Sequence, residues 1–164
     1  MNAAQKLIST SSVFITLIIL SGCPSGNWSE EQRKEFESNC SQVDTVANIV
    51  VMFSGFGNEE FDSLLVREYH DTILLDSFMI YVWPAQSPQD KQSKLRSATI
   101  AHPMCTRNRY HFVVPNMLLY VLADMKMIMW AQYTMGGEDW GCVMGDYTIN
   151  GVRFKDNANP TFVR

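Results

Sequence analysis

Short runs of β-branched and aromatic residues fill the chain from Thr45 onward, and Gly, Pro, Asn and Asp separate them. This pattern constrains the fold most strongly, because short apolar runs bounded by turn residues are typical of strands. The sequence therefore predicts a mainly β protein built as a single β-sandwich with a short N-terminal helix. The predicted strands are Ala47–Ser54, Ser63–Tyr69, Ser77–Trp83, Leu95–Ala101, Tyr110–Val114, Met125–Tyr133 and Cys142–Asn150.

Turn residues support several of the breaks, and the pair Asn150-Gly151 is the strongest of these signals. Asn and Gly both tolerate the positive φ angles that a two-residue type I′ hairpin turn requires. The pair therefore predicts a hairpin between Cys142–Ile149 and Val152–Phe154. The following residues, 156–160, are expected to be irregular.

Residues Ser29-Glu30-Glu31-Gln32 have the spacing of a capping box, in which the first and fourth residues each bind the other's backbone amide. This motif predicts a helix from Ser29 through about Ser38. The helix is polar, so we expect Trp28 and Phe36 to hold it against the domain.

The N-terminal segment has the layout of a secretion signal, because one lysine and no acid precede an apolar run at Val13–Leu20. The run is shorter than the roughly 20 apolar residues that a permanent transmembrane helix needs. It ends in Leu20-Ser21-Gly22-Cys23, which resembles the lipobox of bacterial lipoprotein precursors. The alternative is an ordinary secretory signal with a chance cysteine at its end.

The lipobox resemblance implies a signal peptide at residues 1–22, cleavage before Cys23 and attachment of acyl chains such as palmitate to Cys23. Each buried methylene contributes about 0.8 kcal/mol, so several acyl chains make a durable membrane anchor. Residues 23–28 would then be a tether. Pro24, rather than Asp, follows the cysteine, which by resemblance to the sorting pattern of lipoproteins implies the periplasmic face of the outer membrane.

The remaining residues, 29–164, suit one domain with a real hydrophobic core. Removal of the signal peptide removes only Lys6 from the 13 basic residues, which leaves 12 against 17 acidic residues and a net charge of −5. Nucleic acid is not an expected partner, because phosphate binding needs clustered Lys and Arg.

Three cysteines remain besides the lipidated one: Cys40, Cys105 and Cys142. Two of them are expected to pair in an oxidising periplasm. Of the three pairings we favour Cys40 with Cys142, because that bridge would pin the N-terminal lead-in to a late strand. Closing so long a loop contributes about 4 kcal/mol in the chain-entropy model.

The segments Ile49–Phe56 and Phe61–Tyr69 resemble the opening hairpin of small extracytoplasmic lipoproteins with a transthyretin-like or immunoglobulin-like β-sandwich. The resemblance rests on a strand, a Ser-Gly-Phe turn and a second strand led by Asp. It implies a fold and carries no function, because one fold hosts many functions.

The common catalytic and phosphate-binding motifs are absent from the sequence, so we expect no enzyme and no cofactor. Cys105, His111 and Met117, with His70 or His102, are the ligand types of blue-copper proteins. Their spacings are long for such a site, and His111 falls within a predicted strand. Core packing and a spare thiol are the alternative explanation, and we predict no metal site.

Methionines recur at Met125, Met127 and Met129 with the period of one strand face, which favours core packing over copper(I) binding. Two loops are candidates for contact with a partner, because binding residues often lie on loops. Their candidate residues are Glu59, Glu60, Asp62, Glu138, Asp139 and Trp140. Within Met135–Gly141, a solvated hairpin loop with Trp140 folded back on the sandwich is the alternative.

These observations together predict a membrane-anchored periplasmic lipoprotein that acts as a non-catalytic protein-binding module. The overall layout resembles type VI secretion immunity lipoproteins, which implies that the partner is a secreted antibacterial effector. Its acidic loops would then attract a basic toxin. An envelope or secretion-complex assembly lipoprotein that docks through a sheet edge is the alternative, and a copper-binding redox protein is a third hypothesis.

Overall fold

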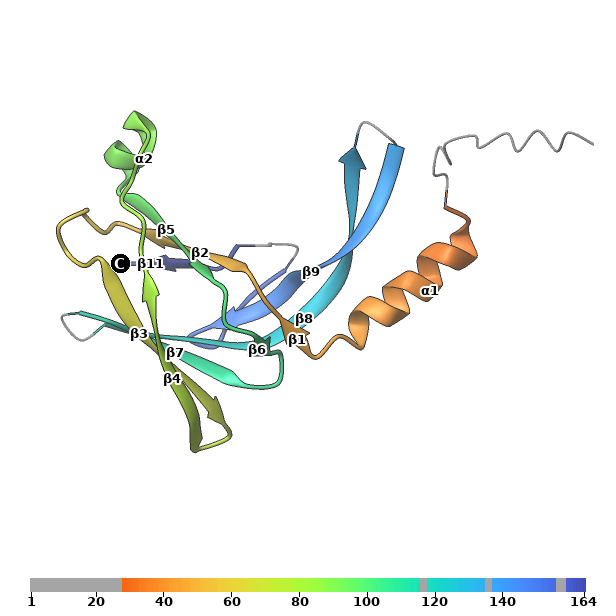
Figure 1. The fold of residues 1–164 in the computed structure, drawn as a ribbon, viewed down its shortest axis with the longest axis horizontal. Coiled ribbons are helices and arrows are strands. Elements are labelled where there is room, and N and C mark those ends of the chain that lie inside the picture. Colours follow the sequence, from red (N-terminus) through yellow and green to blue (C-terminus); the bar gives the residue numbers. More distant parts are fainter. Residues whose placement is uncertain (1–27, 116–117, 135–136, 156–158) are drawn as a thin grey trace, which may run out of the picture.

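The computed structural model describes residues 28–115, 118–134, 137–155 and 159–164. Strands dominate these residues, and one longer and one short helix accompany them (Figure 1). The elements are α1 (Glu30–Ser41), β1 (Thr45–Val46), β2 (Ile49–Ser54), β3 (Ser63–His70), β4 (Ile73–Tyr81), α2 (Pro88–Ser93), β5 (Leu95–Ile100), β6 (Met104–Cys105), β7 (Arg109–Val114), β8 (Leu118–Thr134), β9 (Gly137–Ile149), β10 (Val152–Phe154) and β11 (Thr161–Val163).

The strands form two sheets that pack face to face, so the predicted β-sandwich with a short N-terminal helix is confirmed. The larger sheet has the strand order β10-β9-β8-β7-β3-β4, and all its neighbours are antiparallel. The smaller sheet has the order β11-β2-β5, in which β11 runs parallel to β2. A two-residue ladder joins β1 to β6.

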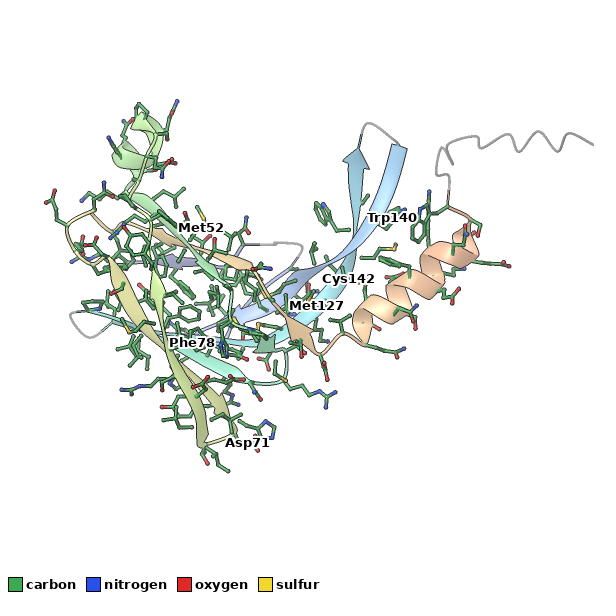
Figure 2. The ribbon with its side chains drawn as sticks, viewed as in Figure 1. Met52, Asp71, Phe78, Met127, Trp140 and Cys142 are labelled. Atoms are coloured by element: carbon green, nitrogen blue, oxygen red, sulfur yellow. A yellow bond between two sulfur atoms is a disulfide. The ribbon has the colours of Figure 1, made fainter. Side chains whose placement is uncertain are left out.

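The core lies between the two sheets and is rich in aromatic rings (Figure 2). Phe162 of β11 lies at its centre, with ring centroids 5.3 Å from Phe53 of β2 and 4.6 Å from Phe112 of β7. Burial of a side chain of this size contributes roughly 1.5–3 kcal/mol. The two sheets are therefore held together by aromatic side chains from both.

Each of the seven predicted strands appears, and three of them differ from the prediction by four residues or more at their start. The strand predicted at Cys142–Asn150 is β9, which already begins at Gly137. The strand predicted at Ser77–Trp83 is β4, which begins at Ile73 because the chain turns tightly at Asp71, where φ is +52°. The strand predicted at Met125–Tyr133 is the second half of β8, which begins at Leu118 and pairs there with β7. The hairpin expected between Ile49–Phe56 and Phe61–Tyr69 is wrong, because β2 and β3 belong to different sheets and do not pair. The sequence did not predict α2, β1, β6 or β11.

Two local predictions are confirmed in detail. The capping box is present, with the Ser29 hydroxyl accepting from the Gln32 amide and the Gln32 side chain accepting from the Ser29 amide, and α1 extends to Ser41. Asn150 and Gly151 both have positive φ, and they join β9 to β10 as a hairpin. The Asn150 side chain also accepts a hydrogen bond from the Val121 amide, which ties the turn to β8.

The far ends of β8 and β9 leave the sandwich as a long two-stranded ribbon, and α1 lies beside it (Figure 1). The ribbon bends where the β8–β9 register shifts twice, between Ala123 and Met127. Asp124 has positive φ there, and Gly145 lies opposite on β9. Bulges of this kind bend a strand and increase its twist.

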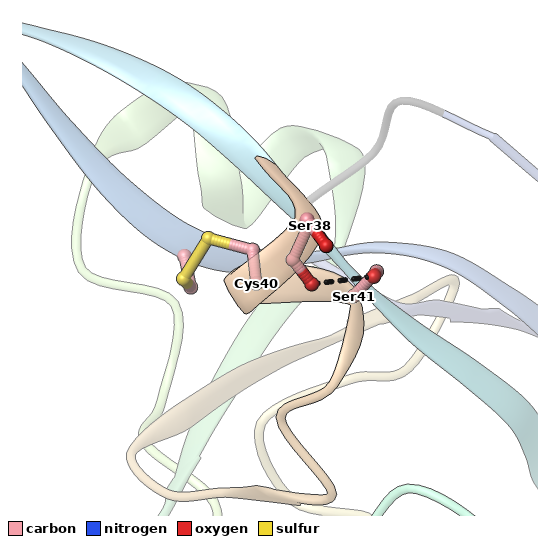
Figure 3. The surroundings of a disulfide bond; sticks show 4 residues. Ser38, Cys40 and Ser41 are labelled. Atoms are coloured by element: carbon pink, nitrogen blue, oxygen red, sulfur yellow. Dashed lines mark hydrogen bonds between the residues drawn. A yellow bond between two sulfur atoms is a disulfide. The ribbon is translucent and has the colours of Figure 1, made fainter. Parts of the chain in front are cut away.

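The disulfide Cys40–Cys142 joins the C-terminal turn of α1 to β9 across 102 residues of sequence, as predicted (Figure 3). Cys40 is fully buried, and the Ser41 hydroxyl beside it donates to the Ser38 carbonyl at 2.7 Å. Cys105 is the free cysteine of the described residues. The bridge therefore fixes a mostly polar helix that has little apolar surface of its own.

We predict that replacing both Cys40 and Cys142 with Ser lowers the free energy of unfolding by up to about 4 kcal/mol, because the unfolded chain regains the entropy of a long loop. Urea denaturation of the purified protein measures the change. Cys105→Ser is the control and is expected to leave the midpoint nearly unchanged. Equal midpoints for all three proteins would contradict a stabilising bridge.

Gly145→Ala is expected to destabilise the protein by about 1–3 kcal/mol, because the added Cβ would overlap Cδ1 and Cγ1 of Ile128 on the facing strand. Thermal unfolding followed by circular dichroism measures the loss. Gly57→Ala is the matched control, since a Cβ there meets only ordinary contacts at 3.5 Å or more. Adding Ile128→Ala to Gly145→Ala should relieve the overlap, and a double variant no more stable than Gly145→Ala would refute this explanation.

Candidate functional site

The first group of predicted partner contacts, Glu59, Glu60 and Asp62, lies in the loop between β2 and β3. Two of these acids already interact with arginines of the same chain. Both carboxylate oxygens of Glu60 accept from Nη1 of Arg164 at 2.9 Å. Asp62 Oδ1 lies 3.7 Å from Nη2 of the buried Arg96. Glu59 is also exposed, and among the described residues no arginine lies within ion-pair distance of it.

The second group, Glu138, Asp139 and Trp140, belongs to β9 and pairs with Tyr133, Gln132 and Ala131 of β8. The loop predicted over Met135–Gly141 is therefore too long, because strand pairing already begins at Gly137. Residues 135–136 and the side chains of Glu138 and Asp139 lie outside the described part.

Trp140 faces α1 rather than the solvent beyond the ribbon (Figure 2). Its ring centroid is 6.5 Å from that of Trp28, and the Arg33 guanidinium lies 5.4 Å from the same ring. Trp28 also contacts Phe36 edge to face at 5.2 Å. Trp28 and Phe36 were expected to hold α1 against the domain, and the contact between Trp28 and Trp140 of β9 agrees with that expectation.

The two groups lie far apart, since the β2–β3 loop and the end of the β8–β9 ribbon are well separated along the longest axis of the molecule (Figure 1). A single acidic face built from both loops is therefore not what the structure presents. The surface that stands out instead is the solvent-facing side of the six-stranded sheet, here named the outer face.

Four apolar side chains form a continuous row across four strands of the outer face. Met79 of β4 pairs with Leu65 of β3, Leu65 pairs with Val113 of β7, and Val113 pairs with Leu119 of β8. Met79 is 60% exposed and Leu119 is 48% exposed. An outward face of an antiparallel sheet is usually polar. This apolar row departs from that rule and needs an explanation.

More apolar surface continues along β4 on both sides of the row. Tyr81 and Trp83, each about half exposed, contact each other edge to face at 4.9 Å. Leu74, which pairs with Tyr69 of the outer face, is also half exposed, near the hairpin turn at Asp71 that Figure 2 labels. Apolar patches of this extent are uncommon on the free surface of a monomer and mark interaction sites.

A basic and aromatic cluster lies next to the apolar row on the same face. It consists of Arg67, Tyr69, Arg109 and His111, in which Arg67 pairs with His111 and Tyr69 pairs with Arg109. The rings of Tyr69 and His111 are 4.4 Å apart. Burial, followed by the positive charges of Arg109 and Arg67, lowers the pKa of His111. Both arginines are exposed, and within the described residues neither forms an ion pair.

The inner side of the sheet at β3 and β7 carries a buried polar network centred on Glu68, which is 8% exposed. Glu68 Oε1 accepts from Nδ2 of Asn108 and from the Tyr110 hydroxyl. Burial, and then the Glu68 carboxylate, raise the pKa of Tyr110 well above its ordinary value. His102 approaches Glu68 and Asp76 at 3.9 and 3.6 Å. These partners satisfy a buried acid and link the loop after β5 to the larger sheet.

The candidate copper ligands are dispersed. Tyr110 points inward and its hydroxyl oxygen lies 3.3 Å from the Cys105 carbonyl oxygen, whereas the adjacent His111 points to the outer face, so Cys105 and His111 lie on opposite sides of the sheet. His70 binds the Asn108 side chain, and His102 stacks on Phe78. Met117 lies outside the described residues. Across those residues, no three His, Cys, Asp or Glu side chains gather closely enough to hold a metal ion.

Of the three methionines expected in the core, Met125 and Met127 are buried there, whereas Met129 is only partly buried. The lipobox residue Cys23 and the rest of the signal segment lie outside the described residues. Neither of the helices that the structure describes has the length and apolar content needed to cross a bilayer.

Sequence reasoning missed the outer face, although a signal was present. Leu64-Leu65-Val66, Phe112-Val113-Val114 and Leu118-Leu119-Tyr120 are runs in which neighbouring residues are all apolar. Because successive side chains in a strand point to opposite faces, such runs place apolar groups on both faces of the sheet.

Comparison with known proteins adds no assignment, since no protein-family model, no curated protein and no solved structure matches this chain.

Proposed function

We propose that this chain is a lipid-anchored periplasmic protein of the outer membrane that acts as a non-catalytic protein-binding module. The observation that carries the binding function is the apolar row Met79–Leu65–Val113–Leu119 on the outer face. The lipobox resemblance at Leu20–Cys23 supports the anchor and the location.

The size of the exposed apolar surface supports a protein as the partner. Half-exposed side chains as large as Met79, Leu119, Tyr81 and Trp83 each offer on the order of 100 Å². A stable protein interface buries about 800 Å² per partner. These four side chains with the rest of the row would supply a substantial part of that area.

A secreted antibacterial effector is the specific partner that the layout of the chain favours by resemblance. In that case the lipoprotein would neutralise the effector in the periplasm. A toxin gene beside the gene for this chain, and protection of cells that express the lipoprotein, would support this form of the function.

Assembly of an envelope or secretion complex is the second candidate, and β4 is the observation that favours it. β4 is the terminal strand of the six-stranded sheet, and Asp76 is its one charged residue. Long apolar edge strands with few charges are templates for the addition of a strand from another protein. A stable complex with envelope machinery that Ser77→Pro abolishes would favour this candidate.

Cys23→Ala is predicted to abolish incorporation of labelled palmitate and to release the protein from the membrane fraction, because Cys23 is the proposed acylation site. Metabolic labelling followed by fractionation of the cells tests the prediction. Cys105→Ala is the matched control and should keep the label. Retention of residues 1–22 together with the absence of label from the unsubstituted chain would refute the proposed anchor.

A photocrosslinker placed on the apolar row should capture a partner, because that surface is where contact is proposed. Benzoylphenylalanine at position 79 on β4 is expected to form a discrete adduct with another protein in the native cell. Thr99 is an exposed residue of the three-stranded sheet, and the same group there is the control and should form none. Equal adducts at both positions, or none at position 79, would count against this binding surface.

A further inference from the structure

The two arginines of the basic cluster differ from the ion-paired arginines elsewhere in the described part of the chain. Arg96, Arg153 and Arg164 each lie near a carboxylate, at 3.7, 2.8 and 2.9 Å. Arg67 and Arg109 are exposed on the outer face, and within the described residues no carboxylate comes within ion-pair distance of either one. Two arginines without such a partner stand together on a chain whose net charge is −4.

The sheet register fixes how these arginines lie relative to the apolar row. Arg67 is two residues from Leu65 on β3, and Arg109 is four residues from Val113 on β7, so both side chains point to the same face as the row. Adjacent strands lie about 4.8 Å apart and side chains on one face recur about every 6.6 Å. A single extended segment can therefore contact the apolar row and the basic cluster at once.

We propose that the outer face binds an acidic segment of a partner protein, with its carboxylates at Arg67 and Arg109 and its apolar side chains on the apolar row. This inference rests on the proposed binding function and specifies the chemistry of its partner. The planar guanidinium of Arg suits paired hydrogen bonds to a carboxylate. The half-buried rings of Tyr69 and His111 beside the arginines reduce exposure to water, which strengthens such pairs.

A membrane surface fits the outer face less well than a protein does. Anionic lipid attracts proteins through clusters of several Lys and Arg, whereas the basic cluster has two arginines on a chain that is acidic overall. The positive charge of two arginines is enough to bind carboxylates of an acidic polypeptide, and the adjacent apolar row would contact its apolar side chains. Binding of lipid headgroups at the basic cluster would overturn the proposal.

The test uses the full chain purified in a non-ionic detergent and three fluorescent nine-residue peptides, in which Val alternates with Glu, Ser or Lys. Fluorescence anisotropy measures the dissociation constant of each peptide. We expect the Glu peptide to bind at least tenfold more tightly than the Lys peptide, with the Ser peptide between them. Equal affinities for the Glu and Lys peptides, or no binding of the Glu peptide, would overturn the proposal.

Charge reversal at the cluster provides the decisive variant. Arg67→Glu with Arg109→Glu should invert the order, so that the Lys peptide binds more tightly than the Glu peptide. Lys91→Glu with Lys94→Glu makes the same change in net charge at exposed positions in and directly after α2, which lies far from β3 and β7 (Figure 1), and should keep the original order. If the first variant fails to fold by circular dichroism, Arg67→Gln with Arg109→Gln should still remove the preference for Glu. A preference that survives neutralisation of both arginines contradicts the proposal.

Two further arms separate this inference from its alternatives. Phosphatidylglycerol added to the micelles should not displace the Glu peptide, and displacement would assign the cluster to lipid headgroups. Met79→Glu with Leu119→Glu should weaken binding of the uncharged Ser peptide. If that variant acts while the arginine variants do not, the partner is not acidic but the proposed binding surface stands. If the photocrosslinker at position 79 captures no protein, the proposed function itself fails.

Discussion

Packing of aromatic rings between the two sheets governs the rest of this structure. The three-stranded sheet is too small to bury its own apolar side, and Phe162, which contacts Phe53 within that sheet, instead lies against Phe112 of the larger sheet. Once those positions point inward, the alternation of the strands determines what points outward. The outer face carries Leu65, Met79, Val113 and Leu119 because their neighbours occupy the core. The exposed apolar row is therefore tied to the register that builds the interior.

Much of the fold could be predicted because its signals are local. The capping box at Ser29 and the Asn150-Gly151 turn each depend on a few neighbouring residues, and the structure contains both. β11 is different, since Thr161–Val163 pairs in parallel with β2, which lies more than a hundred residues earlier. A three-residue run has no periodicity that would identify such a partner. The short helix α2 was likewise hidden in a segment whose Ser and Pro also suit a turn.

The candidate site was harder to predict than the fold. The sequence drew attention to acids in loops, but Glu60 and Asp62 interact with Arg164 and Arg96, which are distant in sequence. Apolar runs such as Leu64-Leu65-Val66 show that both faces of a strand are apolar without showing which residue faces the core. Whether Arg67 and Arg109 have carboxylate partners depends on which strands meet, and that is a property of the tertiary structure. The Cys40–Cys142 pairing was predicted because that bridge would pin the N-terminal lead-in to a late strand, and this argument does not depend on the register of the sheet.

The position of the disulfide also determines how the molecule would respond to mechanical load. A pull between α1 and the C-terminal strand would enter β9 through the Cys40–Cys142 bond, because that bond lies between the helix and the sandwich. The chain between the two cysteines, which includes β2 through β8, would be bypassed and could not lengthen while the bond is intact. Stretching would therefore first separate the helix from the ribbon and detach β10 and β11. The strands between the two cysteines would bear no applied force while the bond is intact.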